Sequence, residues 1–175
     1  MGFNDTSLLC KIVFVFLIFC FIIDLIGFAI PYWYSVDLTI SGVSVKSYGG
    51  LWDLCAENGN IKSCASLTNN GIADWFRAVR AFSILSWLLY LSALVFVIVY
   101  MFFLSDKKML YLVAVCLTFV GALCALIAFA VYSGESSGVL KEYHASFSLT
   151  IIAFILGLIT GVFGIVDYIG FLGGR

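Results

Sequence analysis

The sequence predicts a mainly α membrane protein, a left-handed bundle of four transmembrane helices with a small disulfide-pinned antiparallel β-sheet from its first extracellular loop. Three observations predict this fold. Apolar residues make up 63% of the 175 residues and charged residues only 11%, whereas soluble domains have about 25% charged residues. Four apolar runs are each long enough to cross a bilayer. One long polar connection contains a pair of cysteines.

The composition also excludes two classes of protein. A soluble domain of this length cannot bury so much apolar surface and still present a charged exterior. The net charge is −1, and the nine Lys and Arg residues are scattered, so no basic surface is available for nucleic acid. The chain is therefore neither a soluble enzyme nor a nucleic-acid-binding protein.

Each apolar run supplies the roughly 20 residues that a spanning helix needs. The predicted spans cover about residues 12–30, 81–104, 109–132 and 147–169. The short connection at 105–108 permits only an antiparallel hairpin between the second and third spans. We expect a single domain over residues 1–175, with the longer loops, 31–80 and 133–146, together on one side of the membrane.

The cysteine pair in the first loop indicates the orientation. Disulfides persist in oxidising compartments, so both long loops are expected outside the cell and both termini in the cytosol. The basic residues near the span ends divide four to three and give only a weak positive-inside signal. An alternative is that the first run is a signal peptide cleaved after Ala29, although its length is more typical of a span.

Loop 31–80 contains two predicted β-hairpins. Apolar and polar residues alternate over 36–46, which is typical of the first. Residues 59–60 are Gly-Asn, a common two-residue hairpin connection, and pairing outward from them places Cys55 opposite Cys64. At a non-hydrogen-bonded position this pair is within disulfide reach. The spacing predicts a Cys55–Cys64 disulfide, with two free thiols as the alternative.

Three motifs follow one another along the chain. Trp33 comes directly after the first span, residues 50–55 read GLWDLC, Cys64 follows eight residues later, and Arg80 stands at the entry to the second span. This order resembles the W…GLWxxC…C pattern of the claudin superfamily. That superfamily also includes peripheral myelin protein, epithelial membrane proteins, the lens fibre membrane protein and calcium-channel gamma subunits. The motif residues are Trp33, Gly50, Leu51, Trp52 and Arg80.

The resemblance implies a structural protein of cell–cell contacts in the plasma membrane. Such proteins assemble with like or related four-span proteins, laterally and across cells, into a junctional barrier or a paracellular ion path. It also implies that Leu51 and Trp52 cap the helix bundle beneath the sheet. Two alternatives stay open: an auxiliary, gamma-like subunit of an ion channel or receptor, and an epithelial or myelin-type protein of membrane organisation. Because the chain stops at residues 171–175, shortly after the last span, no C-terminal PDZ ligand is expected.

In the implied ion path, charges near the second hairpin would tune selectivity. The candidates are Asp53, Glu57 and Lys62. The charges of these residues almost cancel, so the preference of the path for cations or anions stays open.

Two charged residues lie in or beside the spans. Asp24 interrupts the first span, and an intramembrane carboxylate costs several kcal/mol unless it is paired or hydrated, which suggests a functional site. The alternative is a hydrogen bond to a facing Ser, Thr or Tyr, or protonation. Arg80 is expected to extend its side chain to the lipid headgroups.

Gly157, Gly161 and Gly164 give the fourth span a small-residue face, which allows helices to approach closely. Packing within the bundle is the favoured interpretation, and a dimer interface is the alternative. Nothing in the sequence indicates catalysis or a cofactor, because no C-x-x-C motif occurs and His144 is the single histidine. A metal site is not expected for the same reason.

Overall fold

The computed structural model describes residues 6–40, 43–59, 61–68, 71–136 and 142–172. This part of the chain contains four helices, all long and apolar enough to cross a membrane. They are α1 (Leu8–Ala29), α2 (Asp74–Phe102), α3 (Lys108–Ser136) and α4 (Ala145–Leu172). The strands are β1 (Tyr34–Ile40), β2 (Val43–Gly49), β3 (Asp53–Asn58), β4 (Ile61–Ser66) and β5 (Glu142–Tyr143). The predicted fold class, a four-helix membrane bundle with a small antiparallel sheet, is confirmed.

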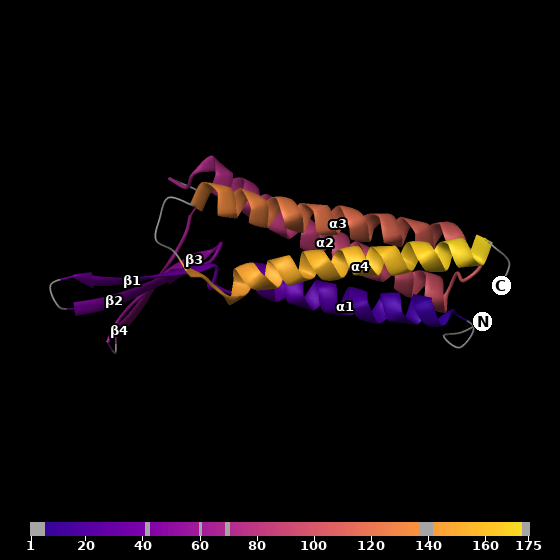
Figure 1. Cartoon of the computed structure of the whole chain (residues 1–175), viewed down its shortest axis with the longest axis horizontal. Helices are drawn as coiled ribbons and strands as arrows, with labels where there is room; N and C mark the ends of the chain where they lie inside the picture. Colours follow the sequence, from indigo (N-terminus) through magenta and orange to yellow (C-terminus); the bar gives the residue numbers. More distant parts are fainter. Residues whose placement is uncertain (1–5, 41–42, 60, 69–70, 137–141, 173–175) are drawn as a thin grey trace.

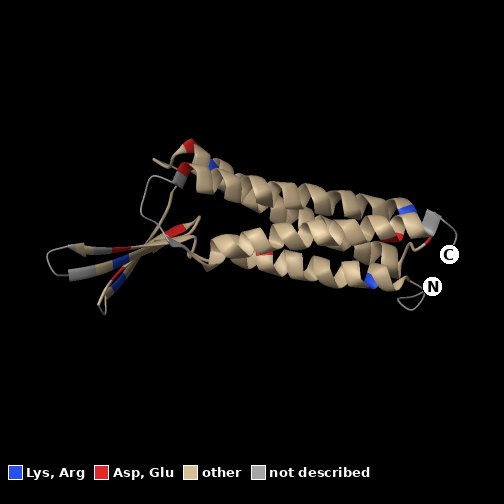
Figure 2. Ribbon diagram, viewed as in Figure 1, with Lys and Arg blue, Asp and Glu red and all other residues tan. Residues whose placement is uncertain are grey.

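The helices run side by side, and the sheet projects from one end of the bundle (Figure 1). The start of α1 and the end of α4 lie together at the opposite end. Figure 2 shows that charged residues are concentrated on the sheet and at the ends of the bundle, while most of its length is uncharged. A bilayer around the helices therefore separates the sheet from the start of α1 and the end of α4.

Two of the helices, α1 and α2, begin several residues before the apolar runs that mark them in the sequence. Ser7 starts α1, because its Oγ accepts a hydrogen bond from the Cys10 backbone N–H at 3.0 Å. Asp74 lies in the first turn of α2, where its negative charge interacts favourably with the positive end of the helix dipole. Arg77 forms an ion pair with it at 3.3 Å. Apolar runs thus mark the lipid-facing length of these helices, and polar residues at the cap of α1 and in the first turn of α2 accompany their earlier starts.

Large apolar side chains lie on both the inside and the outside of the bundle. Tyr90 of α2 is fully buried, and its hydroxyl donates to the Ala153 carbonyl of α4 at 3.0 Å. Other large apolar side chains, including Phe19, Leu123 and Val162, are about half exposed on the helix surfaces. In water such a surface would be unfavourable, so it is the surface that contacts lipid.

The three glycines of the predicted small-residue face all point into the bundle. A Cβ added to Gly157 would overlap the Tyr90 hydroxyl. Added to Gly161 it would lie 2.6 Å from the Phe119 ring, and added to Gly164 it would lie 2.5 Å from a methyl group of Val115. At these three positions α4 therefore approaches Tyr90, Phe119 and Val115 of α2 and α3 closely.

The sheet has the strand order β4-β3-β2-β1-β5, and the pairs described are antiparallel. The register expected from the two hairpins is present: Asp37 pairs with Lys46, and Cys55 pairs with Cys64. The sequence did not predict β5, because a strand of two residues carries no alternating pattern. It joins the second loop to the edge of β1.

Candidate functional site: the sheet and its junction with the bundle

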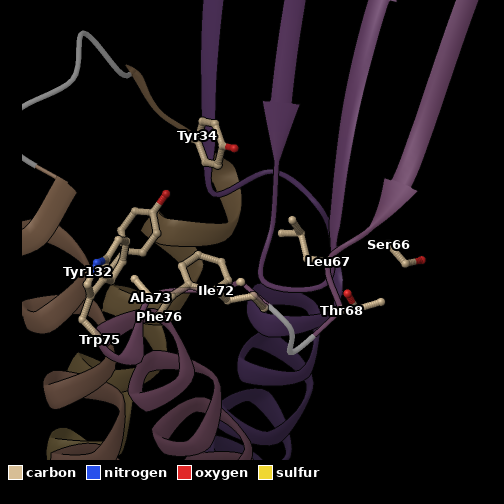
Figure 3. A pocket seen from close by; sticks show the side chains of 10 residues that line it. Tyr34, Ser66, Leu67, Thr68, Ile72, Ala73, Trp75, Phe76 and Tyr132 are labelled. Atoms are coloured by element: carbon tan, nitrogen blue, oxygen red, sulfur yellow. The ribbon is translucent and has the colours of Figure 1, made fainter.

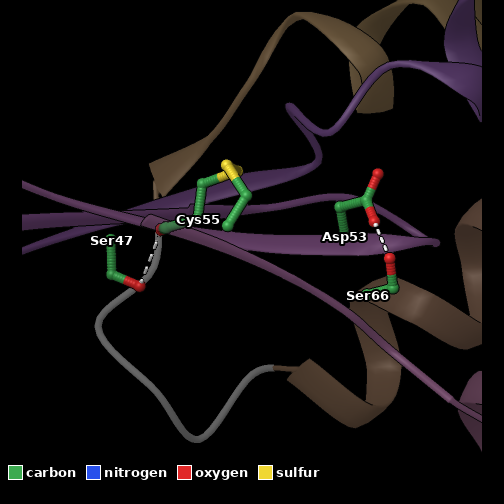
Figure 4. Close-up of a disulfide and its surroundings, with 5 residues drawn as sticks. Ser47, Asp53, Cys55 and Ser66 are labelled. Atoms are coloured by element: carbon green, nitrogen blue, oxygen red, sulfur yellow. Dashed lines mark hydrogen bonds between the residues drawn. A yellow bond between two sulfur atoms is a disulfide. The ribbon is translucent and has the colours of Figure 1, made fainter. Parts of the chain in front are cut away.

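Cys55 and Cys64 form a disulfide that joins β3 to β4, with their Cα atoms 4.1 Å apart (Figure 4). This confirms the prediction made from the hairpin spacing. Polar contacts hold β3 on both sides: Ser47 Oγ of β2 donates to the Cys55 carbonyl at 3.4 Å, and Ser66 Oγ of β4 donates to Asp53 Oδ1 at 2.9 Å. Cys55 is buried, so the disulfide holds β3 at a position where that strand packs against the rest of the protein.

Replacing Cys55 and Cys64 together by serine is expected to destabilise the protein by about 2–3 kcal/mol, because the unfolded chain is no longer cross-linked. Thermal unfolding in detergent micelles without reductant measures the loss. The matched control is Cys116→Ser, which removes an exposed free thiol on α3 and is expected to leave the melting temperature unchanged. Equal melting temperatures for the double variant and the wild type would contradict a stabilising role for the disulfide.

The motif tryptophans cap the end of α1. Trp33 is fully buried, and its indole N–H donates to the Gly27 carbonyl at 2.9 Å. The indole N–H of Trp52 donates to the Phe28 carbonyl, also at 2.9 Å. The last carbonyls of a helix have no partner within it, so these two bonds satisfy groups that would otherwise be buried and unpaired.

The rest of the GLW motif packs against the same helix end. A Cβ on Gly50 would collide with the backbone of Pro31 and lie 2.9 Å from the Ile30 carbonyl, so no larger residue fits there without a shift. Leu51 is fully buried beneath the sheet, as the resemblance implies. Gly50 and Ile30, which are 20 positions apart in the sequence, are thus brought together where the sheet meets the bundle.

The structure corrects the expectation for Arg80. Its guanidinium does not reach the headgroups: Arg80 is 6% exposed, and it donates from Nε to the Leu51 carbonyl at 2.6 Å and from Nη2 to the Leu67 carbonyl at 3.0 Å. It also lies 5.1 Å from the Trp52 ring and 5.2 Å from the Phe76 ring. Fixed carbonyls and ring faces in a water-poor junction offer the cation stronger partners than the membrane surface does. Arg80 therefore links α2 to both ends of the β3–β4 hairpin.

The charged residues of the second hairpin share one face of the sheet. Side chains alternate along a strand and directly paired residues lie on the same face, so Asp53 and Glu57 accompany the disulfide. The register continues this face across four strands as Asp37, Lys46, Glu57 and Lys62, with alternating sign. We refer to these four residues as the charge row. Its charges sum to zero, and Asp53 adds one negative charge beside it.

Aromatic rings lie next to the charge row. Lys62 Nζ is 5.3 Å from the centre of the Tyr48 ring, and that ring stacks on Tyr32 with centroids 5.0 Å apart. The hydrogen bond to Tyr48 raises the pKa of Lys62 above its usual value, and Lys62 therefore remains a cation throughout the physiological pH range. The fixed cation, with Glu57 beside it, is available to interact with ions at every pH that a cell experiences.

Asp24 lies apart from the sheet, inside the bundle. It is 1% exposed and faces Ser86 of α2. Asp24 Oδ2 and Ser86 Oγ have no hydrogen-bond partner within the described residues. The structure does not bring Asp24 together with the charge row.

Two polar contacts join segments that the sequence analysis left unconnected. His144 Nε2 and Ser35 Oγ are 2.5 Å apart, between the start of α4 and β1. Ser7 Oγ donates to Asp167 Oδ1 at 2.6 Å, between the start of α1 and the last turns of α4. More than a hundred residues separate each pair, so no local pattern could have shown them. No group of three His, Cys, Asp or Glu side chains that could hold a metal ion occurs among the residues described.

The chain is similar to one family of known proteins. No curated protein matches it. The model of the PMP-22/EMP/MP20/Claudin family matches residues 6–164, which include the disulfide, the capping tryptophans, Arg80 and most of all four helices. Because the match covers most of the sequence and the same residues build the junction of sheet and bundle, the chain belongs to the PMP-22/EMP/MP20/Claudin family.

Proposed function

We propose that the protein is a structural component of cell–cell contacts in the plasma membrane, with both termini in the cytosol. It assembles with like or related four-span proteins, laterally and across cells, into a junctional barrier or a paracellular ion path. The observation that carries the proposal is the sheet: a disulfide-pinned platform, fixed to the bundle by Trp33, Trp52 and Arg80, that projects from the membrane end opposite the start of α1.

The outer strand of this platform supports an assembly role. All six residues of β4 are exposed, and Ile61 at its start is 73% exposed although it lies far from the lipid-facing helices. An edge strand offers unpaired backbone groups, and an exposed large apolar residue outside the membrane favours contact with another protein.

Expression in a junction-poor epithelial monolayer tests the proposal. We expect the protein to concentrate at cell–cell contacts and to change the transepithelial resistance, with the Cys55→Ser, Cys64→Ser variant losing both effects. Unchanged resistance together with a uniform surface distribution would refute it. Co-purification with one large channel or receptor and altered gating would instead support the auxiliary-subunit alternative.

In the ion-path form of the proposal, the charge row and Asp53 set selectivity. Lys62→Glu makes the face more negative and is expected to raise the permeability of sodium over chloride by about two- to fivefold, because surface charge raises the local concentration of counter-ions. Glu57→Lys is the matched opposite change and is expected to lower the ratio. Dilution potentials across the monolayer measure it. A shift in the same direction for both variants, or none for either, would contradict a selectivity role.

A further inference from the structure

We propose that an apolar pocket at the junction of sheet and bundle binds a sterol from the adjoining leaflet of the membrane. This inference goes beyond the contact-forming function and does not depend on it. It rests on the position, lining and rigidity of the pocket.

The pocket has a volume of about 410 Å³ and lies among the start of β1, the end of β4, the first turn of α2 and the last turns of α3. Figure 3 shows Leu67 on one side of it and Trp75, Phe76 and Tyr132 on the other, with Tyr34 above them toward the sheet. Volumes of several hundred Å³ with aromatic and aliphatic walls are typical of small-molecule sites.

The position of the pocket places it beside lipid. Trp75 and Phe76 belong to the first turn of α2, and Tyr132 lies in the last turns of α3, so the floor of the pocket is formed where two membrane-spanning helices leave the bilayer. The same helices carry exposed large apolar side chains and are apolar enough to span a membrane. The pocket therefore lies at the level where these two helices leave the bilayer, and a lipid of that leaflet is the occupant that we assign to it.

The lining selects an uncharged occupant. None of the ten residues that line the pocket is charged, so a phospholipid headgroup or a fatty-acid carboxylate would lose hydration there without gaining an opposite charge. The side-chain polar groups of the lining are uncharged: the indole N–H of Trp75 and the hydroxyls of Tyr34, Ser66, Thr68 and Tyr132. Burial raises the pKa of Tyr34, which keeps that hydroxyl neutral at physiological pH and suited to hydrogen bonding with another hydroxyl. An uncharged, mainly apolar molecule that carries one hydroxyl group is therefore suited to this lining.

The aromatic wall favours a rigid body over a flexible chain. The ring centroids of Trp75 and Phe76 are 5.4 Å apart, those of Trp75 and Tyr132 6.1 Å, and those of Phe76 and Tyr132 6.5 Å. Three rings that pack on one another form a preorganised surface. A fused-ring sterol has few torsions to immobilise against it, whereas an acyl chain must order one torsion for each methylene group.

Photolabelling tests this proposal. The full chain is reconstituted in phosphatidylcholine vesicles that contain a photoactivatable, alkyne-tagged cholesterol, and labelled peptides are mapped by mass spectrometry. We expect labelling to concentrate between residues 67 and 76 and near Tyr132, and to be competed by cholesterol but not by cholesterol sulfate or diacylglycerol. Labels spread evenly along the lipid-facing helix surfaces, or equal competition by diacylglycerol, would overturn the proposal.

Variants that fill the pocket provide the second arm. Ile72→Trp places an indole within it and is expected to reduce labelling of these peptides by roughly tenfold, since a ring in the binding volume excludes the ligand. The matched control, Ile61→Trp, adds the same bulk on the exposed β4 strand and should leave labelling unchanged.

Leu67→Trp fills the pocket from the opposite wall, so the test survives if the first variant does not fold. Retention of the Cys55–Cys64 disulfide on non-reducing gels identifies folded protein. Undiminished labelling in a folded filling variant would overturn the proposal. So would a cross-link from position 72 to a second copy of the chain that persists when cholesterol is added, because the occupant would then be another subunit.

Discussion

Replacing Gly157 by alanine is expected to destabilise the bundle by about 2–4 kcal/mol, because the site has no room for a methyl group. The added Cβ would overlap the Tyr90 hydroxyl and lie 3.1 Å from the Cβ of Ala122. Tyr90 cannot move away freely, since it is fully buried and its hydroxyl is bonded to the Ala153 carbonyl. Either α4 shifts away from α2 and α3 or this buried hydrogen bond is lost.

Gly134→Ala is the matched control, because it makes the same chemical change in an exposed helical position where an added Cβ meets nothing within 4 Å. Alanine has the higher helix propensity, so this variant is expected to be unchanged or more stable by up to about 1 kcal/mol. Unfolding of both variants in the same micelles, followed by tryptophan fluorescence, measures the difference. Equal stabilities would show that the close approach of α4 at Gly157 does not stabilise the bundle.

Replacing Arg80 by leucine is expected to lower the free energy of unfolding by about 3–5 kcal/mol. This is the second of the two largest effects that we expect. Leucine keeps much of the apolar volume but leaves the buried carbonyls of Leu51 and Leu67 without the donors that Arg80 supplies. The rings of Trp52 and Phe76 also lose their contacts with the guanidinium. Because Leu51, Trp52 and Leu67 flank the β3–β4 hairpin, this hairpin should loosen together with the start of α2.

Arg77→Leu provides the comparison, since Arg77 is half exposed and pairs with a fully accessible carboxylate of Asp74. Exposed ion pairs contribute little, so we expect its effect on stability to stay below about 1 kcal/mol. Unfolding temperature and delivery to the cell surface are measured for both variants. If Arg80→Leu behaved like Arg77→Leu, the guanidinium would have no structural importance at the junction.

The variants also separate assembly from selectivity in the proposed ion path. Arg80 and Gly157 lie in the junction and the bundle, away from the charge row, so their substitution should reduce the amount of folded protein without changing the sodium-to-chloride ratio of what remains. Lys62→Glu should do the reverse. A changed ratio in Gly157→Ala would indicate that the charge row alone does not set selectivity.

Features that depend on short stretches of sequence could be predicted. Pairing outward from Gly59 placed Cys55 opposite Cys64, because strand register follows from a tight turn and a two-residue period. Arg80 shows the limit of this reasoning. Its position near the membrane surface predicted a side chain directed at headgroups, and only the folded loop brought the carbonyls of Leu51 and Leu67 within its reach.

The sequence by itself determined the four apolar helices, the two hairpins and the disulfide, since lipid burial, strand alternation and turn chemistry act over a few neighbouring residues. Only the tertiary structure decided which carbonyls of α1 accept from the indoles of Trp33 and Trp52. It also decided that His144 contacts Ser35 and that Gly157 faces Tyr90. These contacts join segments whose meeting depends on how whole helices and strands pack. That packing is a property of the complete set of side-chain shapes, which no local pattern contains.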